Sequence, residues 1–256
     1  VTFEQMLNAG VHFGHLKRKW NPSMSPYIFD EKKGIHVIDL NKTLIKLEEA
    51  SNAMRQIAKS GRKILFVATK KQAKDIMSNK VAEVNMPSIT ERWPGGLLTN
   101  FKTTRRTIKM RTTLDKMMKD GTADTMSKRE RLQLTRKREK IDKIFGSISD
   151  MNRLPAAIFI VDVKKEHIAL AEARNLNIPI FAMVDTNSSP EGIDFVIPSN
   201  DDATKSIDLV VSNLCDSIKE GLGERKQTKE KIAQEKSASE AAKTEENQVK
   251  KEEVKS

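Results

Sequence analysis

The 256-residue sequence contains a single cysteine, Cys215, which excludes a disulfide framework within the chain and a zinc site built from several cysteines. Aromatic residues make up only 5% of the chain. The longest apolar run, Ala156 to Val161, is far too short to span a bilayer. The first twenty residues lack the apolar core of a secretion signal. We therefore expect a soluble protein of a reducing compartment, in the cytoplasm.

Phosphate-binding glycine motifs are also missing. No G-x-G-x-x-G follows an apolar run, and no G-x-x-x-x-G-K-[ST] occurs anywhere. Only four histidines are present, so nucleophilic catalysis and zinc binding have few candidates. His12 and His15 form an H-x-x-H pair that would share a face of a helix. For this pair we favour packing against Trp20 or Phe13, or a contact with nucleic acid, over metal binding, and we expect no cofactor.

Positive charge is what the sequence has in excess, and it is unevenly distributed. Lys and Arg total 46 against 35 acidic residues. Residues 99–146 carry a net charge of +9, residues 1–98 carry +7, residues 147–223 carry −6 and residues 224–256 carry +1. Because solubility needs only a modest net charge, this concentration favours a basic face that meets a polyanion. The acidic stretch is then available to protein neighbours.

Short, near-continuous apolar runs predict the buried strands of a parallel sheet. These runs are 35–40, 64–68, 156–161, 178–184 and the shorter 194–198. Amphipathic segments between and after them predict helices over 43–60, 73–84, 166–175 and 203–220. The alternation of strands and helices indicates an α/β fold with right-handed crossovers. Residues 1–98 are expected to form the N-terminal segment and the first part of the α/β body, and residues 147–223 its second part.

Residues 99–146 interrupt this alternation and predict a helical hairpin that projects from the α/β body. Two polar helical segments flank Asp120-Gly121-Thr122, and Ser127 and Glu130 have the spacing of a capping box. A thin apolar seam, typical of two helices packed on each other, is formed by Phe101, Ile108, Leu114, Met117, Met118, Leu132, Ile141, Ile144 and Phe145. Residues 224–256 are rich in charge and poor in apolar side chains, so we expect disorder or a loose helix there.

Three groups of residues are candidates for contacts with phosphates. They are Lys17, Arg18 and Lys19 with Trp20; Arg92 with Trp93; and Lys102, Arg105, Arg106, Lys109, Arg111, Arg136, Lys137 and Arg138. An arginine beside an aromatic ring is typical of nucleotide contacts, but packing between a loop and the body is an equal alternative for Trp93. For the hairpin, the alternative is a solvated charged surface. Base-reading motifs are missing, which favours a structured RNA recognised by its shape.

Two further classes of function stay open on the residues alone. Asp39, Asp162 and Asp185 follow predicted strands, and carboxylates at strand ends bind Mg²⁺ in some α/β enzymes. We favour capping of helices and turns for these three residues, with an enzyme that uses Asp162 and Asp185 as the alternative. A third hypothesis is an adaptor protein whose hairpin binds acidic proteins.

Several longer motifs, taken together and in this order, resemble one known family. They are MLNAGVHFGH at 6–15, WNP at 20–22, RWPGGLLTNF at 92–101, PAAIFIVD at 155–162, VDTN at 184–187 and NDDA at 200–203. Over about residues 3 to 223, the chain resembles the bacterial small ribosomal subunit protein number two (the S-two family). Pro94, Ser199 and Ser188-Ser189 depart from the family pattern, but none of them lies in the basic groups.

The resemblance implies a doubly wound, flavodoxin-like parallel sheet of about five strands with a protruding coiled-coil hairpin. It further implies a non-enzymatic, structural constituent of the bacterial small ribosomal subunit that supports translation. The partners that it implies are small-subunit ribosomal RNA and neighbouring ribosomal proteins, including the large mRNA-binding first protein, which the family helps to dock. Neither a membrane nor a small-molecule substrate is implied.

Overall fold

The computed structural model describes residues 1–120 and 126–253, with side chains described as far as residue 230 except that of residue 229. Its centre is a parallel sheet with the strand order β5-β4-β6-β7-β8. The strands are β4 (Ile64–Val67), β5 (Ser88–Ile89), β6 (Ala157–Val161), β7 (Ile180–Val184) and β8 (Phe195–Pro198). Counted along the chain, this is the 2-1-3-4-5 order of flavodoxin-like folds. The expected doubly wound α/β fold is therefore confirmed.

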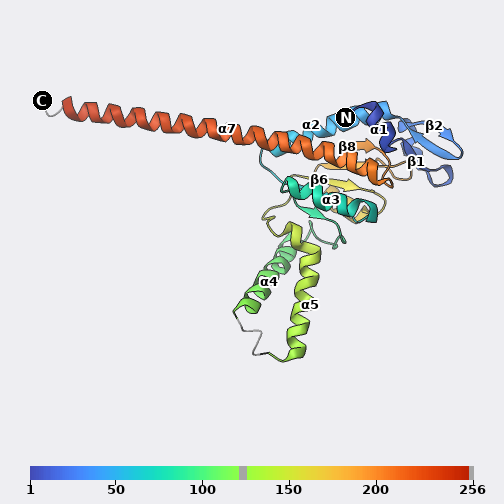
Figure 1. The fold of residues 1–256 in the computed structure, drawn as a ribbon, viewed down its shortest axis with the longest axis horizontal. Helices are drawn as coiled ribbons and strands as arrows, with labels where there is room; N and C mark the ends of the chain where they lie inside the picture. Colours follow the sequence, from blue (N-terminus) through green and yellow to red (C-terminus); the bar gives the residue numbers. More distant parts are fainter. Residues whose placement is uncertain (121–125, 254–256) are drawn as a thin grey trace.

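Helices cover both faces of this sheet (Figure 1). They are α1 (Phe3–Ala9), α2 (Leu40–Lys59), α3 (Lys71–Glu83), α6 (His167–Asn175) and α7 (Thr204–Glu253). Side chains alternate between the faces of a strand, so Phe66 and Phe159 join the core beneath α1, α2, α3 and α7. Their neighbours Leu65 and Ile158 join a second core, which α6 and the base of the hairpin cover.

One predicted strand lies outside this sheet, so that prediction is wrong. Residues 35–38 form the middle strand of a small antiparallel sheet with the order β1-β3-β2. The bounds are β1 (Phe13–Leu16), β2 (Ile28–Lys32) and β3 (Ile35–Ile38). Only His36 and Ile38 of β3 are buried, as expected for a sheet with one covered face. The fifth strand of the parallel sheet is instead β5, whose two residues are too few to form an apolar run.

The helical hairpin projects from the body as a narrow arm (Figure 1). Its elements are α4 (Phe101–Lys119), α5 (Lys128–Phe145) and the short return helix η4 (Gly146–Ile148). The capping box is confirmed: Ser127 Oγ accepts the Glu130 amide at 3.3 Å, and the Glu130 carboxylate accepts the Ser127 amide at 3.1 Å. Gly121 and Thr122 of the expected turn lie outside the described residues.

The apolar seam of the arm is thinner than the sequence predicts. Ile108, Leu114 and Ile141 are buried, and Ile108 also joins the core of the body. Met117 is 37% exposed and Leu132 is 50% exposed, so neither contributes much to the seam. Polar contacts must therefore supply part of what holds the two helices together.

Helix α7 begins at Thr204, and its first half packs on the sheet through Ile207, Val210 and Leu214. The backbone then stays helical as far as Glu253. For residues 224–256 the sequence predicts disorder or a loose helix; the helical backbone described as far as Glu253 is compatible with the loose helix, and the disordered alternative stays a prediction. Lys, Glu, Ala and Gln, which dominate this segment, are strong helix formers. In the part of the chain that is described, no helix is apolar enough over a sufficient length to cross a membrane.

Candidate nucleic-acid interface

The cations predicted on the arm fall into two groups, of which one holds the arm together. Arg111 Nη2 lies 2.8 Å from Oδ1 of Asp142 and so joins α4 to α5. Arg138 on α5 forms a second ion pair with Asp115 on α4. Both pairs cross between the helices beside the buried Leu114 and Ile141. The charges of Arg111 and Arg138 are therefore engaged within the protein.

The guanidinium group of Arg105, at the base of the arm, also has its partners within the protein. Its Nη1 donates to the carbonyl oxygen of Met151 at 2.9 Å and also contacts the side chain of Asn152. Both acceptors lie on the segment that leads from the arm back to β6. Arg105 thus ties the start of α4 to the chain that leaves the hairpin.

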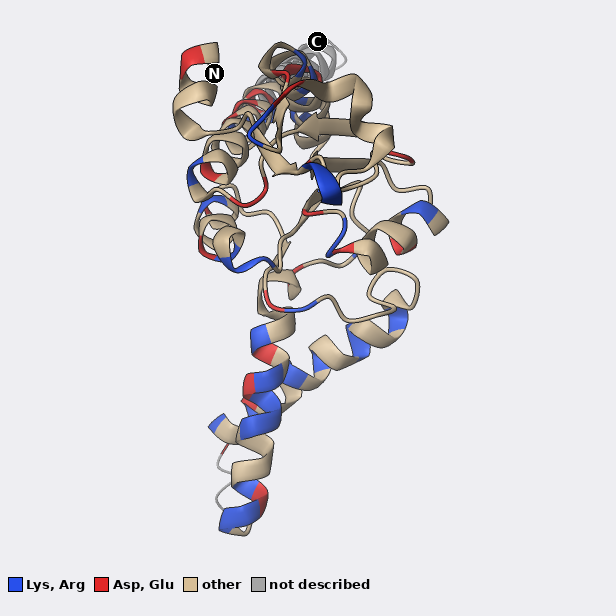
Figure 2. Ribbon diagram, turned by 90° about the vertical axis from the view of Figure 1, so that its right-hand side faces the viewer, with Lys and Arg blue, Asp and Glu red and all other residues tan. Residues whose placement is uncertain are grey.

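The second group of cations is exposed and forms a stripe along α4. We call it the α4 stripe, and its members are Lys102, Arg106, Lys109 and Lys116. Spacings of four, three and seven residues place all of them on one face of the helix. Their side chains form no hydrogen bond or ion pair with any other residue whose side chain is described. Figure 2 shows that Lys and Arg are concentrated on the arm and scattered over the body.

Helix α5 carries exposed cations of the same kind. Arg136 and Lys137 were selected from the sequence, and both are exposed without a partner among the described side chains. Arg129 and Lys140, seven residues before and four residues after Arg136, lie on the same face and are exposed too. Lys116 and Lys140 are not among the site residues predicted from the sequence, although their helical spacing identifies them.

The basic residues of the N-terminal segment lie on an exposed turn, the 3-10 helix η1 (Lys17–Lys19). Lys17 Nζ forms an exposed ion pair with Glu31 at 2.7 Å. The Trp20 ring packs 5.1 Å from that of His36, measured between centroids, and stays 36% exposed. Part of the indole face is therefore available to a stacking partner beside the cations.

Arg92 and Trp93 have different surroundings, although they are neighbours in the sequence. Arg92 is exposed. Trp93 is only 6% exposed, and its Nε1 donates to Glu172 at 3.0 Å. Packing between loop and body, one of the two alternatives for Trp93, is what the structure has, because so buried a ring is inaccessible to a base. Arg92 alone remains for a contact with phosphate.

Sequence analysis missed Glu172, which holds this loop. The Glu172 carboxylate accepts the backbone amides of Gly96, Leu98 and Thr99 at 2.7, 2.9 and 3.1 Å. Burial opposes ionisation of Glu172, but the hydrogen bonds from Trp93 and these amides outweigh it and hold its pKa below the ordinary value. The one signal in the sequence was a single acid between two alanines on the buried face of a helix.

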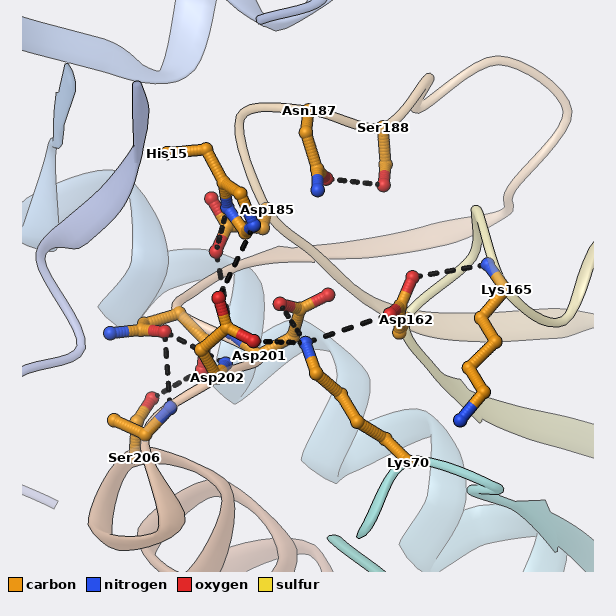
Figure 3. A network of polar contacts seen from close by, with 12 residues as sticks. His15, Lys70, Asp162, Lys165, Asp185, Asn187, Ser188, Asp201, Asp202 and Ser206 are labelled. Carbon is orange, nitrogen blue, oxygen red and sulfur yellow. Dashed lines mark hydrogen bonds and ion pairs between the residues drawn. The ribbon is translucent and has the colours of Figure 1, made fainter. Parts of the chain in front are cut away.

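A polar cluster occupies the carboxyl ends of the parallel strands, where doubly wound folds bind their ligands (Figure 3). The ammonium group of Lys70 contacts Asp201 at 2.8 Å, Asp202 at 2.6 Å and Asp162 at 3.5 Å. Burial opposes the charge on Lys70, but its hydrogen bonds to Asp201 and Asp202 raise its pKa. Side chains of the protein itself thus fill the crevice with an ionic network.

His15 connects this network to the N-terminal segment. Its Nδ1 lies 3.0 Å from Oδ2 of Asp185, and its Nε2 lies 3.2 Å from Oδ2 of Asp202. The hydrogen bond to Asp185 raises the pKa of His15. His12 packs instead on Phe13, with ring centroids 4.0 Å apart. The two histidines separate because this stretch is extended, and residues three apart on a strand point to opposite sides.

Among the described side chains, donor atoms of His15, Asp185 and Asp201 lie within 4.8 Å of one another and are suited to a divalent cation. Asp201 is fully buried, and its Oδ2 has no hydrogen-bond partner. Burial and the nearby Asp185 carboxylate raise the pKa of Asp201 to about 7. A cation at this position would compete with the Lys70 ammonium for the same carboxylate.

The capping interpretation of Asp39, Asp162 and Asp185 is confirmed. Each carboxylate accepts a backbone amide within three residues: that of Asn41 at 3.0 Å, that of Lys165 at 3.1 Å and that of Thr186 at 2.5 Å. Asp39 follows β3 of the small sheet and not a strand of the parallel sheet. Asp162 and Asp185 additionally belong to the ionic network described above.

Comparison with known proteins agrees with the motifs and the fold. A family model described as Ribosomal protein S2 matches residues 6–221. A small ribosomal subunit protein uS2 of Azobacteroides pseudotrichonymphae is 63% identical over 88% of this chain and 86% of its own length. Those of Parabacteroides distasonis and Flavobacterium johnsoniae are 61% and 59% identical, over 90% and 92% of this chain and 82% and 92% of their own lengths. The chain therefore belongs to the ribosomal protein S2 family.

Proposed function

We propose that this protein is a structural constituent of the small ribosomal subunit that binds small-subunit ribosomal RNA through its exposed cations. The observation that carries the proposal is the α4 stripe, whose charges have no partner among the described side chains. Unpaired cations on a projecting arm are available to neutralise phosphates, whereas the paired arginines are not. Ribosomal proteins of this family are structural and not enzymes, which supports a role in translation within the cytoplasmic ribosome.

The geometry of the α4 stripe suits an RNA backbone. From Lys102 to Lys116 the helix rises by about 21 Å at 1.5 Å per residue, which is long enough to follow several phosphates. Arg136 and Lys137 on α5 add a second row of charge on the same arm. Folded RNA is recognised largely by its shape and its backbone, for which such rows of flexible cations are suited.

The remaining candidates divide by the contacts that they make. Lys17–Lys19, Trp20 and Arg92 are exposed on the body and are proposed as further contacts with RNA. Arg105, Arg111 and Arg138 keep the arm in shape, and we assign them no phosphate.

The acidic half of the body is proposed as the side that meets protein neighbours. Residues 147–223 carry a net charge of −6, which repels RNA and favours basic partners. By its resemblance to the family, the protein helps to dock the large mRNA-binding first protein of the small subunit. The support for this partner is the resemblance and the charge of this region.

The test compares two triple charge reversals. The first variant replaces Lys102, Arg106 and Lys109 by Glu. The control variant replaces three exposed lysines of the body by Glu, namely Lys71, Lys164 and Lys205. Binding to small-subunit ribosomal RNA is measured as a function of salt. Since each neutralised phosphate contributes about 0.9 to the slope of log K against log salt, the first variant is expected to lose roughly 2 to 3 units of slope. Equal slopes for the two variants would contradict the role of the α4 stripe.

The competing hypotheses give different results. An adaptor that binds acidic proteins through the arm would keep its partners after nuclease treatment, whereas a ribosomal constituent would lose those held by RNA. A free enzyme would stay at the top of a sucrose gradient of native lysate. The ribosomal constituent is expected to sediment with small subunits, and the first triple variant is expected to be depleted from them.

A further inference from the structure

The loop that leads into the arm is held from one point of the body, the carboxylate of Glu172. Oε1 accepts the Trp93 indole N–H at 3.0 Å and the Gly96 amide at 2.7 Å. Oε2 accepts the Leu98 amide at 2.9 Å and, from Thr99, the amide at 3.1 Å and the hydroxyl at 3.3 Å. Five donors from a single loop therefore converge on one side chain of α6.

These donors lie directly before α4 in the chain, so the contact also positions the start of the arm. Thr99 is two residues before Phe101, at which α4 begins. A loop fixed as far as Thr99 leaves only Asn100 between the fixed backbone and the first turn of the arm. The direction in which α4 leaves the body is thus set where the carboxylate holds the loop. On the other side of the base, Arg105 ties α4 to the returning chain.

The charge of Glu172 is essential to this contact. Glu172 is buried, with 7% of its surface exposed, and none of its hydrogen-bond donors is a charged side chain. A carboxylate offers acceptor sites on both oxygens, which matches a loop that presents only donors. A glutamine has the same shape, but its NH₂ group would face N–H donors on one side. Losing those partners leaves buried amides unsatisfied.

We propose that Glu172 is the positioning residue of the arm, which fixes the angle of the α4–α5 hairpin to the body and thereby presents the α4 stripe to RNA. The effect on RNA rests on the proposed function, whereas the effect on the angle does not. Glu172 contacts no RNA, because its side chain is buried beneath the loop. Its contribution to binding is preorganisation, which lowers the entropy that a swinging arm would lose on docking.

The matched control is Glu166, at the start of the same helix. Glu166 is 3% exposed and accepts the backbone amide of Thr69 at 3.1 Å, so it is also a buried acid that holds a loop. Its loop follows β4 and does not lead into the arm. Glu166→Gln therefore reproduces the loss of a buried carboxylate without touching the base of the hairpin.

The angle is measured by pulsed electron-spin distances between labels at Ser78→Cys on α3 and Gln133→Cys on α5, both exposed. The native Cys215 is buried, and burial raises the pKa of its thiol to about 12, so it stays unlabelled. The parent protein and Glu166→Gln are expected to give one narrow distribution. Glu172→Gln is expected to give one at least about twice as wide, with RNA affinity lowered about tenfold.

Each outcome decides a separate question. An unchanged distance distribution in Glu172→Gln overturns the positioning role, whatever RNA binding does. A widened distribution with unchanged affinity overturns the link to RNA; if the triple reversal of the α4 stripe still weakens binding, the proposed function stands. Should Glu172→Gln fail to fold, Trp93→Phe removes one donor and keeps the carboxylate. It is expected to widen the distribution by a smaller factor, and no widening would count against the proposal.

Discussion

Gly14 in β1 lies directly against Thr186, the second residue after β7. A Cβ atom on Gly14 would come within 2.6 Å of Thr186 Cγ2 and within 2.9 Å of the carbonyl oxygen of His36. The same threonine accepts the backbone amide of His15 at 2.8 Å through its hydroxyl, and that of Asn21 at 2.7 Å through its carbonyl oxygen. The N-terminal sheet is therefore docked on the body at a joint that has no room for a side chain at Gly14.

Gly14→Ala is accordingly expected to loosen this joint. Overpacking of a close contact costs about 1 to 3 kcal/mol, and the N-terminal sheet is the part that gives way. Trypsin should then cut faster at Lys17–Lys19, which lie on the same segment. The control is Gly95→Ala, since a Cβ there meets no atom within 4 Å. Identical cleavage rates in the two variants would show that the joint tolerates the methyl group.

Asp115 forms one of the two ion pairs described above that join the helices of the arm. It pairs with Arg138 across the hairpin and lies 3.9 Å from Nε of Arg111 on its own helix. We expect Asp115→Asn to reduce the free energy of unfolding by less than about 1 kcal/mol, since such partly exposed pairs are weak. The amides of α5 should nevertheless exchange with deuterium faster. Asp120→Asn removes the same charge from an exposed position and should leave the exchange unchanged.

Lys70 is the lysine at the centre of the ionic network formed with Asp162, Asp201 and Asp202. Lys70→Met would leave Asp162, Asp201 and Asp202 without it, and a buried charge without its partner costs about 3 kcal/mol. We expect a loss of this size in urea unfolding at neutral pH, with partial recovery when Asp201→Asn is added. Lys74→Met, which breaks a partly exposed pair with Glu91, is expected to cost less than about 1 kcal/mol. A cost for Lys70→Met no larger than this would refute the central role of Lys70.

The stabilisation of the folded protein by Glu172 is expected to decrease as the pH falls into the acid range. Its pKa in the folded protein is lowered from the ordinary value of 4.5, because the hydrogen bonds from Trp93 and the loop amides outweigh burial. The stabilisation is therefore fully present above pH 4.5 and is lost as the pH falls through the lower, folded value. The difference in unfolding free energy between the parent and Glu172→Gln should be constant near neutrality and shrink in acid. A difference that grows in acid would contradict the ionised form.

Local patterns in the sequence predict most of the elements of this fold. Four of the five strands of the parallel sheet, the helices α2, α3, α6 and α7 around it and the projecting hairpin follow from apolar runs, helical periodicity and one capping box, whereas α1 is not predicted. These signals are local, since each depends on residues within one element. β5 is not predicted, because a strand of two residues is too short to show a hydrophobic pattern. β3 is assigned to the wrong sheet, because an apolar run does not indicate which strand it pairs with.

The contacts that define the candidate site are not local, and the sequence predicts them poorly. Lys70 and Asp201 are 131 residues apart, and Trp93 and Glu172 are 79 apart. Whether an arginine of the arm is paired or free depends on which residue of the partner helix faces it. Charge counts alone therefore identify the arm as basic but do not separate Arg111 and Arg138 from the α4 stripe.

The joint between the N-terminal sheet and the body also determines when the molecule can be completed. The Gly10 carbonyl oxygen accepts the side chain of Asn200 at 3.1 Å, across 190 residues, and the His15 amide bonds to Thr186 across 171. The N-terminal sheet therefore cannot complete its contacts with the body until β7 and β8, which follow it in the chain, have been made. The N-terminal sheet is thus made before the surface on which it docks, and a nascent chain stalled before β7 would leave this joint unformed.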